Sequence, residues 1–215
     1  MTSIKKSVLL PSLVPTVEGL IKHFDEISVE RKQILKQLTL FIENKLQQSK
    51  NIDLNFICTH NSRRSHLSQL WAQTAAYYYC IPGVTCYSGG TEATAFNHRA
   101  VKAMQEAGFA ISKVSDGENP VYTVIFSEEA PGIEAFSKKY SDPINNSNDF
   151  AAVMTCSHAD ENCPFIPGAS ARIAITYDDP KIFDDTPLEA MKYKERVDQI
   201  GTEILFAFSQ VKFPA

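Results

Sequence analysis

Residues 52–65 read Ile-Asp-Leu-Asn-Phe-Ile-Cys-Thr-His-Asn-Ser-Arg-Arg-Ser and carry the strongest structural signal in the chain. Residues 52–57 alternate and then run continuously apolar, which is typical of a buried strand. Residues 65–79 have the pattern of a helix. Between the two lies the pattern Cys-x5-Arg-Ser, beginning at Cys58 and reaching Arg64. We therefore expect a strand-to-helix turn with a cysteine at one end and an arginine at the other.

Such a turn collects backbone N–H groups at the positive end of a helix dipole, where they can bind a tetrahedral oxyanion. Phosphate and arsenate both fit that description. Arg64 would add a bidentate contact to two oxygens of the anion, which a lysine could not match in geometry. The same field stabilises a thiolate at Cys58. We therefore predict a nucleophile and the binding site of its electrophile in one loop.

The other residues of this turn are expected to shape the loop or to bind the anion. Asn61 is available for a left-handed backbone position, and Ser65 is placed to donate its hydroxyl to the thiolate. Because a cysteine followed six residues later by an arginine also occurs by chance, the flanking strand and helix are what make the motif informative. The predicted oxyanion-binding residues are Thr59, His60, Asn61, Ser62, Arg63, Arg64 and Ser65.

Composition excludes several classes of protein. The chain has 215 residues, of which 44% are hydrophobic, so it can bury one substantial core. Its net charge of −4 argues against non-specific nucleic-acid binding, which needs a basic surface. No apolar run approaches the roughly 20 residues of a membrane helix. We expect a cytoplasmic protein without nucleic-acid or membrane partners.

The five cysteines are too few for a disulfide scaffold, and their odd number leaves at least one thiol free. Cys156 and Cys163 enclose a polar segment that could be a flexible loop or one helical turn able to bring the two sulfurs together. Zinc is the competing use, with His158 between them. The spacing is not that of the usual short Cys-x-x-Cys knuckle, and no second cysteine pair follows, so we predict no metal site.

The first 50 residues differ from the rest of the chain. Residues 17–23 and 29–46 show apolar side chains at helical spacing, which predicts two helices. One face of the second helix is expected to pack on the body of the protein. We predict a helical extension over residues 1–50 and a main domain over residues 51–215. The side chains expected on that face are Leu35, Leu38, Phe41, Ile42 and Leu46.

From residue 52 onward, strand-like runs alternate with amphipathic helices. This order predicts an α/β fold, with a mostly parallel central sheet, helices on both faces and ligands at the carboxyl ends of the strands. Residues 127–148 are expected to form an inserted surface helix and loop that could line the mouth of the site. The expected strands are 52–57, 84–88, 121–126, 150–155 and 171–176, and the expected helices are 65–79, 97–107, 133–140 and 187–209. Just past strand ends lie Cys58, Ser88, Cys156, Asp178 and Asp179.

A thiolate that attacks phosphorus or arsenic needs a proton for the departing oxygen, so a carboxylic acid should stand opposite the arginine. Residues 177–180, Tyr-Asp-Asp-Pro, supply the best candidate. The proline favours an extended or turn geometry at Asp179, which would project its carboxylate from the loop after the last strand. Asp178 stays open as the alternative acid, since Asp-Asp-Pro is also a common turn sequence.

With these residues in place, the chain resembles the low-molecular-weight protein tyrosine phosphatase superfamily, and within it the thioredoxin-coupled arsenate reductases. The resemblance covers residues 52 to about 209. Besides the Cys-x5-Arg-Ser loop, it includes residues 87–92 (Tyr-Ser-Gly-Gly-Thr-Glu) and 97–101 (Asn-His-Arg-Ala-Val). It implies the phosphotyrosine protein phosphatase I-like fold. It also implies that Cys58 is the nucleophile, Arg64 the oxyanion clamp and Asp179 the proton donor.

Residues 155–164, Thr-Cys-Ser-His-Ala-Asp-Glu-Asn-Cys-Pro, resemble the redox segment of these reductases. By this resemblance Cys156 attacks at Cys58 to release arsenite, and Cys163 then attacks Cys156. Thioredoxin, an external thiol reductant, reduces the final disulfide, so no bound cofactor is expected. Exchange of this kind requires accessible thiolates and movable loops.

Two substitutions and two segments depart from the family pattern. His60 replaces the glycine usual in the loop, and Arg63 stands where many members carry a second cysteine. Residues 1–50 and 127–148 have no counterpart in the minimal fold. Arsenate reduction remains the preferred prediction because it uses three cysteines, whereas tyrosine dephosphorylation, the alternative, uses only Cys58. A binding module that senses phosphate or redox state is the third possibility.

Overall fold

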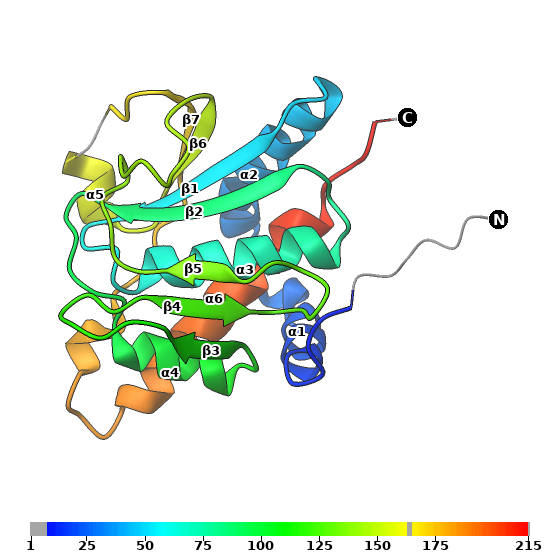
Figure 1. Ribbon diagram of the computed structural model, residues 1–215. Coiled ribbons are helices and arrows are strands. Elements are labelled where there is room, and N and C mark those ends of the chain that lie inside the picture. Colours follow the sequence, from blue (N-terminus) through cyan, green and yellow to red (C-terminus); the bar gives the residue numbers. More distant parts are fainter. Residues whose placement is uncertain (1–7, 163–164, 215) are drawn as a thin grey trace.

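The computed structural model describes residues 8–162 and 165–214, and it contains two sheets and a set of packed helices (Figure 1). Short 3-10 turns, η1 and η2, supplement the α-helices. In chain order the elements are α1 (Val14–Ile21), η1 (Phe24–Glu26), α2 (Val29–Gln47), β1 (Ile52–Cys58), α3 (Arg64–Tyr78), β2 (Val84–Gly90), α4 (His98–Glu106), β3 (Ala110–Lys113), β4 (Tyr122–Ile125), β5 (Ile133–Ala135), β6 (Phe150–Met154), α5 (Ser157–Asn162), β7 (Ala169–Ala174), η2 (Pro180–Phe183) and α6 (Glu189–Ser209).

The central sheet is parallel throughout, with strand order β2-β1-β6-β7. Ile57 near the end of β1 pairs with Gly89 on one side and with Met154 on the other. The carboxyl ends of these strands therefore meet at one edge, and β1 and β2 point toward α5 there (Figure 1). The predicted parallel sheet is confirmed, and Cys58 stands at the end of an inner strand.

Helices cover the two faces of this sheet unequally. Leu54 and Phe56 of β1 are fully buried in the main hydrophobic core, to which α2, α3 and α6 also contribute. Ile57 points to the opposite face, because successive residues of a strand alternate. There it joins a smaller cluster that includes Cys58, Cys156 and Ala159 of α5. The smaller cluster places two cysteines in one apolar layer.

The N-terminal helices share the main core with the rest of the chain. Leu35, Leu38 and Ile42 lie on one face of α2 and are fully buried. The partly buried Phe41 and Leu46 pack against the same core. The α2 helix contacts α6, β7 and β1, and α1 also packs on α6. The division into an extension and a main domain at residue 50 stays a prediction.

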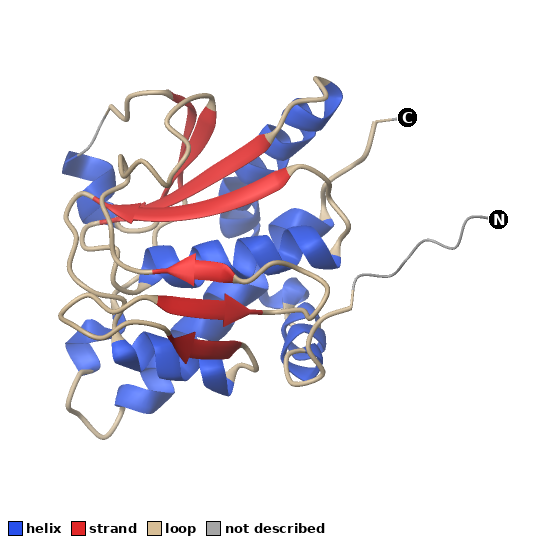
Figure 2. Cartoon of the chain, viewed as in Figure 1, coloured by secondary structure: helices blue, strands red, loops and turns tan. Residues whose placement is uncertain are grey.

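The prediction of a helix over residues 133–140 is wrong. Residues 133–135 form β5, in which Glu134 is exposed while Ala135 is buried, and this is the alternation of a strand. The β5 strand pairs with β4, which is antiparallel to it and to β3. Pairing with β5 gives hydrogen-bond partners to backbone N–H and C=O groups of β4, which a helix in place of β5 would leave unpaired. The predicted strand 121–126 thus forms as β4 but belongs to this second sheet, and β3 was not predicted (Figure 2).

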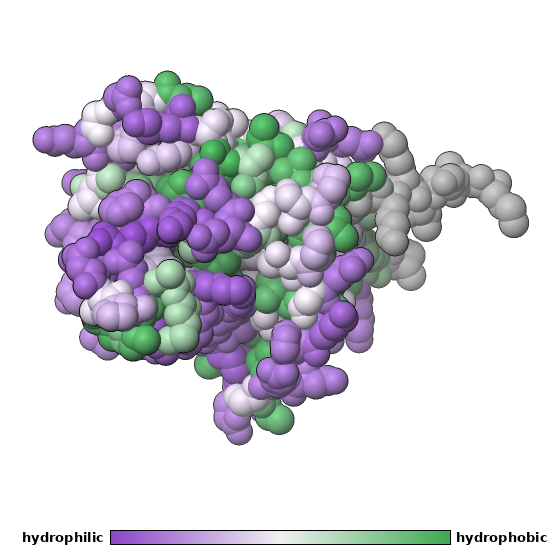
Figure 3. Space-filling view, turned by 90° about the horizontal axis from the view of Figure 1, so that it is seen from below, coloured by the Kyte–Doolittle hydropathy of each residue, from purple (hydrophilic) through white to green (hydrophobic). Residues whose placement is uncertain are grey.

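Polar side chains cover most of the face drawn in Figure 3, with apolar residues scattered among them. Within residues 8–162 and 165–214, no helix combines the length and the apolar character needed to cross a bilayer.

Candidate active site

The turn between β1 and α3 forms a compact loop, residues 58–65, at the carboxyl edge of the sheet. The loop packs against the end of β2 so closely that a side chain would not fit there. A Cβ built on Gly90 would lie 2.2 Å from Glu92 O and 2.7 Å from both Asn61 N and Thr59 O. Glycine at position 90 therefore permits the close approach that fixes the loop.

Carbonyl groups of loop 58–65 accept hydrogen bonds from segments outside the loop. Because the N–H and C=O groups of one trans peptide point in opposite directions, these bonds direct the loop N–H groups inward. The result is a ring of donors ahead of the first turn of α3, as an oxyanion requires. The bonds are Thr91 N to Cys58 O (3.1 Å), Glu92 N to Thr59 O (2.8 Å), Thr91 Oγ1 to Thr59 O (3.1 Å), Thr94 Oγ1 to His60 O (3.2 Å), Ser137 Oγ to His60 O (2.9 Å) and Asn97 N to Ser62 O (2.9 Å).

Three side chains of the loop arrange a donor for the sulfur of Cys58. Asn61 has a positive φ of 44°, in the left-handed region predicted for it. Its Nδ2 donates to Ser65 Oγ at 2.9 Å. Because that oxygen is already an acceptor, the hydroxyl hydrogen is available to Cys58 Sγ, which lies 3.1 Å away. Asn61 and Ser65 thus hold a hydroxyl against the sulfur of Cys58, a residue that is only 3% exposed.

Arg64, the first residue of α3, reaches the loop that follows β7. Its Nη1 donates to Tyr177 O at 2.9 Å, and its Nη2 donates to Asp179 Oδ2 at 2.8 Å. Within the described part of the chain, no group accepts a hydrogen bond from its buried Nε. An oxyanion in the loop would supply that acceptor. Protein acceptors thus hold Nη1 and Nη2 of the guanidinium, and Nε is available to donate to an anion.

The two candidate acids differ in position. The Asp179 side chain is 28% exposed and lies 2.8 Å from Arg64. Its Oδ1 also accepts from Lys181 N at 3.0 Å, which caps η2. The Asp178 side chain is 95% exposed and comes no nearer than 3.6 Å to Arg196. The geometry favours Asp179, which keeps its role as the proposed acid.

Two predicted oxyanion ligands have their side chains engaged elsewhere. Arg63 Nε donates to Tyr193 Oη at 2.7 Å and Arg63 Nη2 to Asp184 Oδ2 at 3.1 Å. His60 is half-exposed, with Nε2 3.7 Å from Glu92 Oε2. For both residues, the backbone N–H is the group that the loop can offer to an anion. Ser62 is largely buried within the loop.

Cys156 follows β6 after one intervening residue, Thr155, and is fully buried. Its Sγ lies 3.5 Å from the Oγ1 of Thr59, the residue next to Cys58 in sequence. The same hydroxyl lies 3.3 Å from His158 Nδ1. The structure therefore brings Cys156 against the loop that carries Cys58. Cys163 lies outside the described residues.

The segment from Cys156 to Asn162, here called the redox arm, also contacts the body away from Thr59. Arg172 of β7 forms an ion pair with Asp160, at 2.5 Å from Oδ1. Ala159 is buried in the smaller cluster.

Across residues 8–162 and 165–214, no three His, Cys, Asp or Glu side chains gather as a metal site would require.

Several residues that hold the loop were not found from the sequence. Lys138 N donates to Asn61 Oδ1 at 2.9 Å, and burial lowers the pKa of the Lys138 side chain to about 8. Tyr193 and Asp184 hold Arg63, and Tyr193 Oη donates to Asp184 Oδ1 at 2.7 Å. None of these lies near residues 58–65 in the chain, so no local pattern signals them.

The chain was compared with protein families, curated proteins and solved structures, and no family model matches it. The arsenate reductase of Bacillus subtilis is 31% identical over 164 residues, 76% of this chain and 94% of that protein. The arsenate reductase of Bacillus licheniformis is 31% identical over 151 residues, 69% of this chain and 89% of that protein.

Two solved structures share lower identity with this chain. A thioredoxin-dependent arsenate reductase of Corynebacterium glutamicum is 18% identical, with a TM-score of 0.39 and coverage of 88% of this chain and 80% of that chain. A low-molecular-weight phosphotyrosine phosphatase of Vibrio cholerae is 12% identical, with a TM-score of 0.48 and coverage of 73% and 94%. On the strength of the two Bacillus relatives, the chain belongs to the arsenate reductase family.

Proposed function

We propose that this protein is an arsenate reductase whose reaction begins at Cys58. The Cys58 thiolate attacks arsenic(V) held by the loop N–H groups and Arg64, and an arsenate oxygen leaves as water after taking a proton from Asp179. Each group acts where charge develops in the transition state, on the entering sulfur or on the departing oxygen. The product of this step is a covalent bond between Cys58 Sγ and arsenic.

The reduction itself uses Cys156. Its thiolate attacks Cys58 Sγ, a sulfur–sulfur bond forms, and the electron pair of the sulfur–arsenic bond stays on arsenic, which leaves as arsenite. Cys163 then attacks Cys156, forms the Cys156–Cys163 disulfide and frees the Cys58 thiolate. Thioredoxin, the proposed partner, supplies two electrons to reduce that disulfide. The two electrons gained by arsenic are thus the two lost by a pair of thiolates.

One observation carries this proposal: the sulfur of Cys156 contacts Thr59, the neighbour of Cys58, at 3.5 Å. Hydrolysis of a phosphate ester, the alternative function, needs Cys58, Arg64 and Asp179 but no second cysteine at the loop. A module that only senses phosphate or redox state would need no acid opposite the clamp.

A paired assay tests the proposal, with arsenate and thioredoxin recycling in one arm and para-nitrophenyl phosphate in the other. We expect Cys156→Ser and Cys163→Ser each to block multiple-turnover arsenate reduction and to leave hydrolysis of the aryl phosphate nearly intact. Cys86→Ser is the matched control. Cys86 is also a buried cysteine, it lies in β2 away from the loop, and burial raises its thiol pKa well above the usual value.

Mass spectrometry after a single turnover without reductant gives the direct readout. Wild-type protein should contain a Cys156–Cys163 disulfide, and Cys163→Ser should trap Cys58 with Cys156. If both cysteine variants reduce arsenate at the full rate, or if no disulfide forms, the reductase proposal fails. Turnover of the aryl phosphate alone would then favour a phosphatase, and turnover of neither substrate would favour a binding module.

A further inference from the structure

Arg31 is a residue of α2 that reaches across to the other end of the chain. Its Nε and Nη2 donate to Glu203 Oε2 of α6 at 2.9 and 2.7 Å. Both side chains are largely buried, with 19% of Arg31 and 7% of Glu203 exposed. The pair fixes the guanidinium of Arg31 in one position.

From this position Arg31 also contacts the loop that carries Asp179. Arg31 Nη2 donates to Thr176 O at 3.2 Å, and the Arg31 Cζ lies 4.9 Å from the ring centroid of Tyr177. From loop 58–65, Arg64 Nη1 donates to Tyr177 O at 2.9 Å. Two arginines from different helices therefore hold consecutive carbonyl groups of one peptide segment.

Besides the two arginines, the burial of Tyr177 and backbone hydrogen bonds to the end of β6 hold this segment. Tyr177 N donates to Thr155 O at 3.1 Å, which ties it to the end of β6. Beyond Tyr177 the backbone leads in two residues to Asp179, whose carboxylate must face the same oxyanion as Arg64. A shift of this segment would displace both Asp179 and Tyr177 O, which accepts a hydrogen bond from Arg64.

We propose that Arg31 is a positioning residue of the active site, through which α2 holds the acid loop and the clamp in their working geometry. This inference rests on the proposed chemistry at Cys58. It gives the N-terminal helices a role in the reaction besides filling the core. The effect is indirect, because within the described residues the Arg31 side chain donates hydrogen bonds to Glu203 and to Thr176 O and not to Cys58 or the carboxylate of Asp179.

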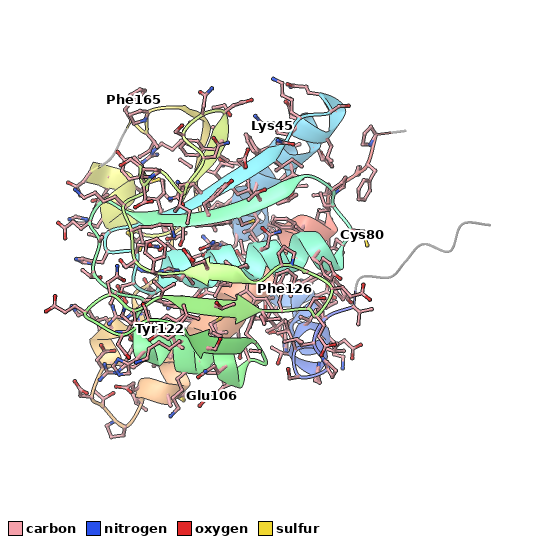
Figure 4. The ribbon with its side chains drawn as sticks, in the orientation of Figure 1. Lys45, Cys80, Glu106, Tyr122, Phe126 and Phe165 are labelled. Carbon is pink, nitrogen blue, oxygen red and sulfur yellow. The ribbon has the colours of Figure 1, made fainter. Side chains whose placement is uncertain are left out.

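Lys45 provides a matched control on the same helix. It is also buried, at 5% exposed, and its Nζ pairs with Asp149 Oδ1 at 2.5 Å. Asp149 directly precedes β6, so this tie lies at the amino end of the parallel sheet, away from the edge where the strands end (Figure 4). Both residues attach α2 to the body, but only Arg31 attaches it to the acid loop.

The test compares three variants for kcat and KM with arsenate and with para-nitrophenyl phosphate. Arg31→Lys keeps a cation beside Glu203 but cannot bind Glu203 and Thr176 together through a planar fork. The double variant Arg31→Met with Glu203→Leu removes both charges, so neither is left buried alone. In both we expect kcat to fall about tenfold to a hundredfold for either substrate, with KM changed less than about threefold. Lys45→Met should stay within about twofold of wild type in both constants.

Amide hydrogen exchange of residues 175–179 gives a readout that does not depend on turnover. We expect faster exchange there in both Arg31 variants and wild-type exchange there in Lys45→Met, with melting temperatures recorded for all three. Wild-type kcat with protected exchange in either Arg31 variant overturns the inference. An equal loss of kcat in Lys45→Met also overturns it, since the effect would then be one of general stability. Wild-type protein inactive on both substrates refutes the proposed function instead, and the exchange data then decide alone whether Arg31 holds the loop.

Discussion

Loop 58–65 and the redox arm both follow strands of one sheet, yet they are held very differently. The loop carbonyls accept six hydrogen bonds from residues 91–97 and 137, and the loop packs against Gly90. The redox arm is joined to the body by the Arg172–Asp160 pair, by buried Cys156 and Ala159, and by the contacts of Thr59 Oγ1 with Cys156 Sγ and His158 Nδ1. A site that stabilises charge on an oxyanion works best with fixed donors, whereas thiol exchange needs sulfurs that can move. Under the proposed chemistry, one edge of the sheet would serve both the oxyanion step, which needs fixed groups, and the thiol exchange, which needs movable ones.

The largest expected effect is that of Cys58→Ser. This change should abolish turnover of both arsenate and aryl phosphate, because the nucleophile of both reactions is lost. Oxyanion binding should remain measurable by titration calorimetry with phosphate, since the loop amides and Arg64 are retained. Substantial turnover in this variant would remove Cys58 from the mechanism, and loss of phosphate binding would mean that the sulfur helps to hold the loop.

Asp179→Asn should come second. General acid catalysis typically contributes about 10²- to 10⁴-fold, and we expect a loss of kcat in this range with a smaller effect on substrate binding. The loss should shrink for aryl phosphates whose leaving group needs no proton. Asp178→Asn is the control, because its side chain is 95% exposed. If Asp178→Asn is the damaging change and Asp179→Asn is silent, the acid has been assigned to the wrong carboxylate.

Arg64→Lys keeps the positive charge of the oxyanion clamp but loses the planar guanidinium that can donate two parallel hydrogen bonds. By analogy with the removal of one oxyanion donor, we expect a loss of about 2–4 kcal/mol in transition-state stabilisation. It would be measured as a fall in kcat/KM for both substrates. A rate equal to that of wild type would show that the amides of the loop suffice without a bidentate arginine.

The smallest effect should come from the redox arm. Arg172→Met removes a partly exposed ion pair, and such pairs contribute at most about 1 kcal/mol to stability. We expect faster amide exchange in residues 156–162, a change of less than about threefold in the rate of disulfide formation, and unchanged hydrolysis of aryl phosphate. A fall in aryl phosphate hydrolysis would contradict the contrast between loop 58–65 and the redox arm, because it would make the redox arm part of the anion site.

The chemistry of loop 58–65 could be predicted from the sequence because its parts are contiguous. The strand before it, the helix after it, the left-handed Asn61 and the serine beside the sulfur all lie within one short segment. The order of strands and helices likewise fixed where Asp179 would emerge. Local pattern and tertiary structure agree here, as is expected where every level points to the same fold.

The supports of the site could not be predicted, because they come from distant segments. Tyr193 lies 130 residues from Arg63, and Glu203 lies 172 residues from Arg31. The second sheet was missed for a similar reason. Residues 133–135 form a strand of only three residues. They form it because they pair with the neighbouring β4, and their own periodicity does not predict it.

The packing of α1 and α2 against α6 has a consequence for how the protein is made. The ribosome completes the first two helices long before the helix that covers them, since α2 ends at Gln47 and α6 begins only at Glu189. Until then the apolar face of α2 has no partner from the C-terminal end, and Arg31 lacks Glu203. A stop codon before residue 189 would therefore leave loop 58–65 translated but the acid loop unbraced, so catalytic competence should arise only after α6 has been synthesised.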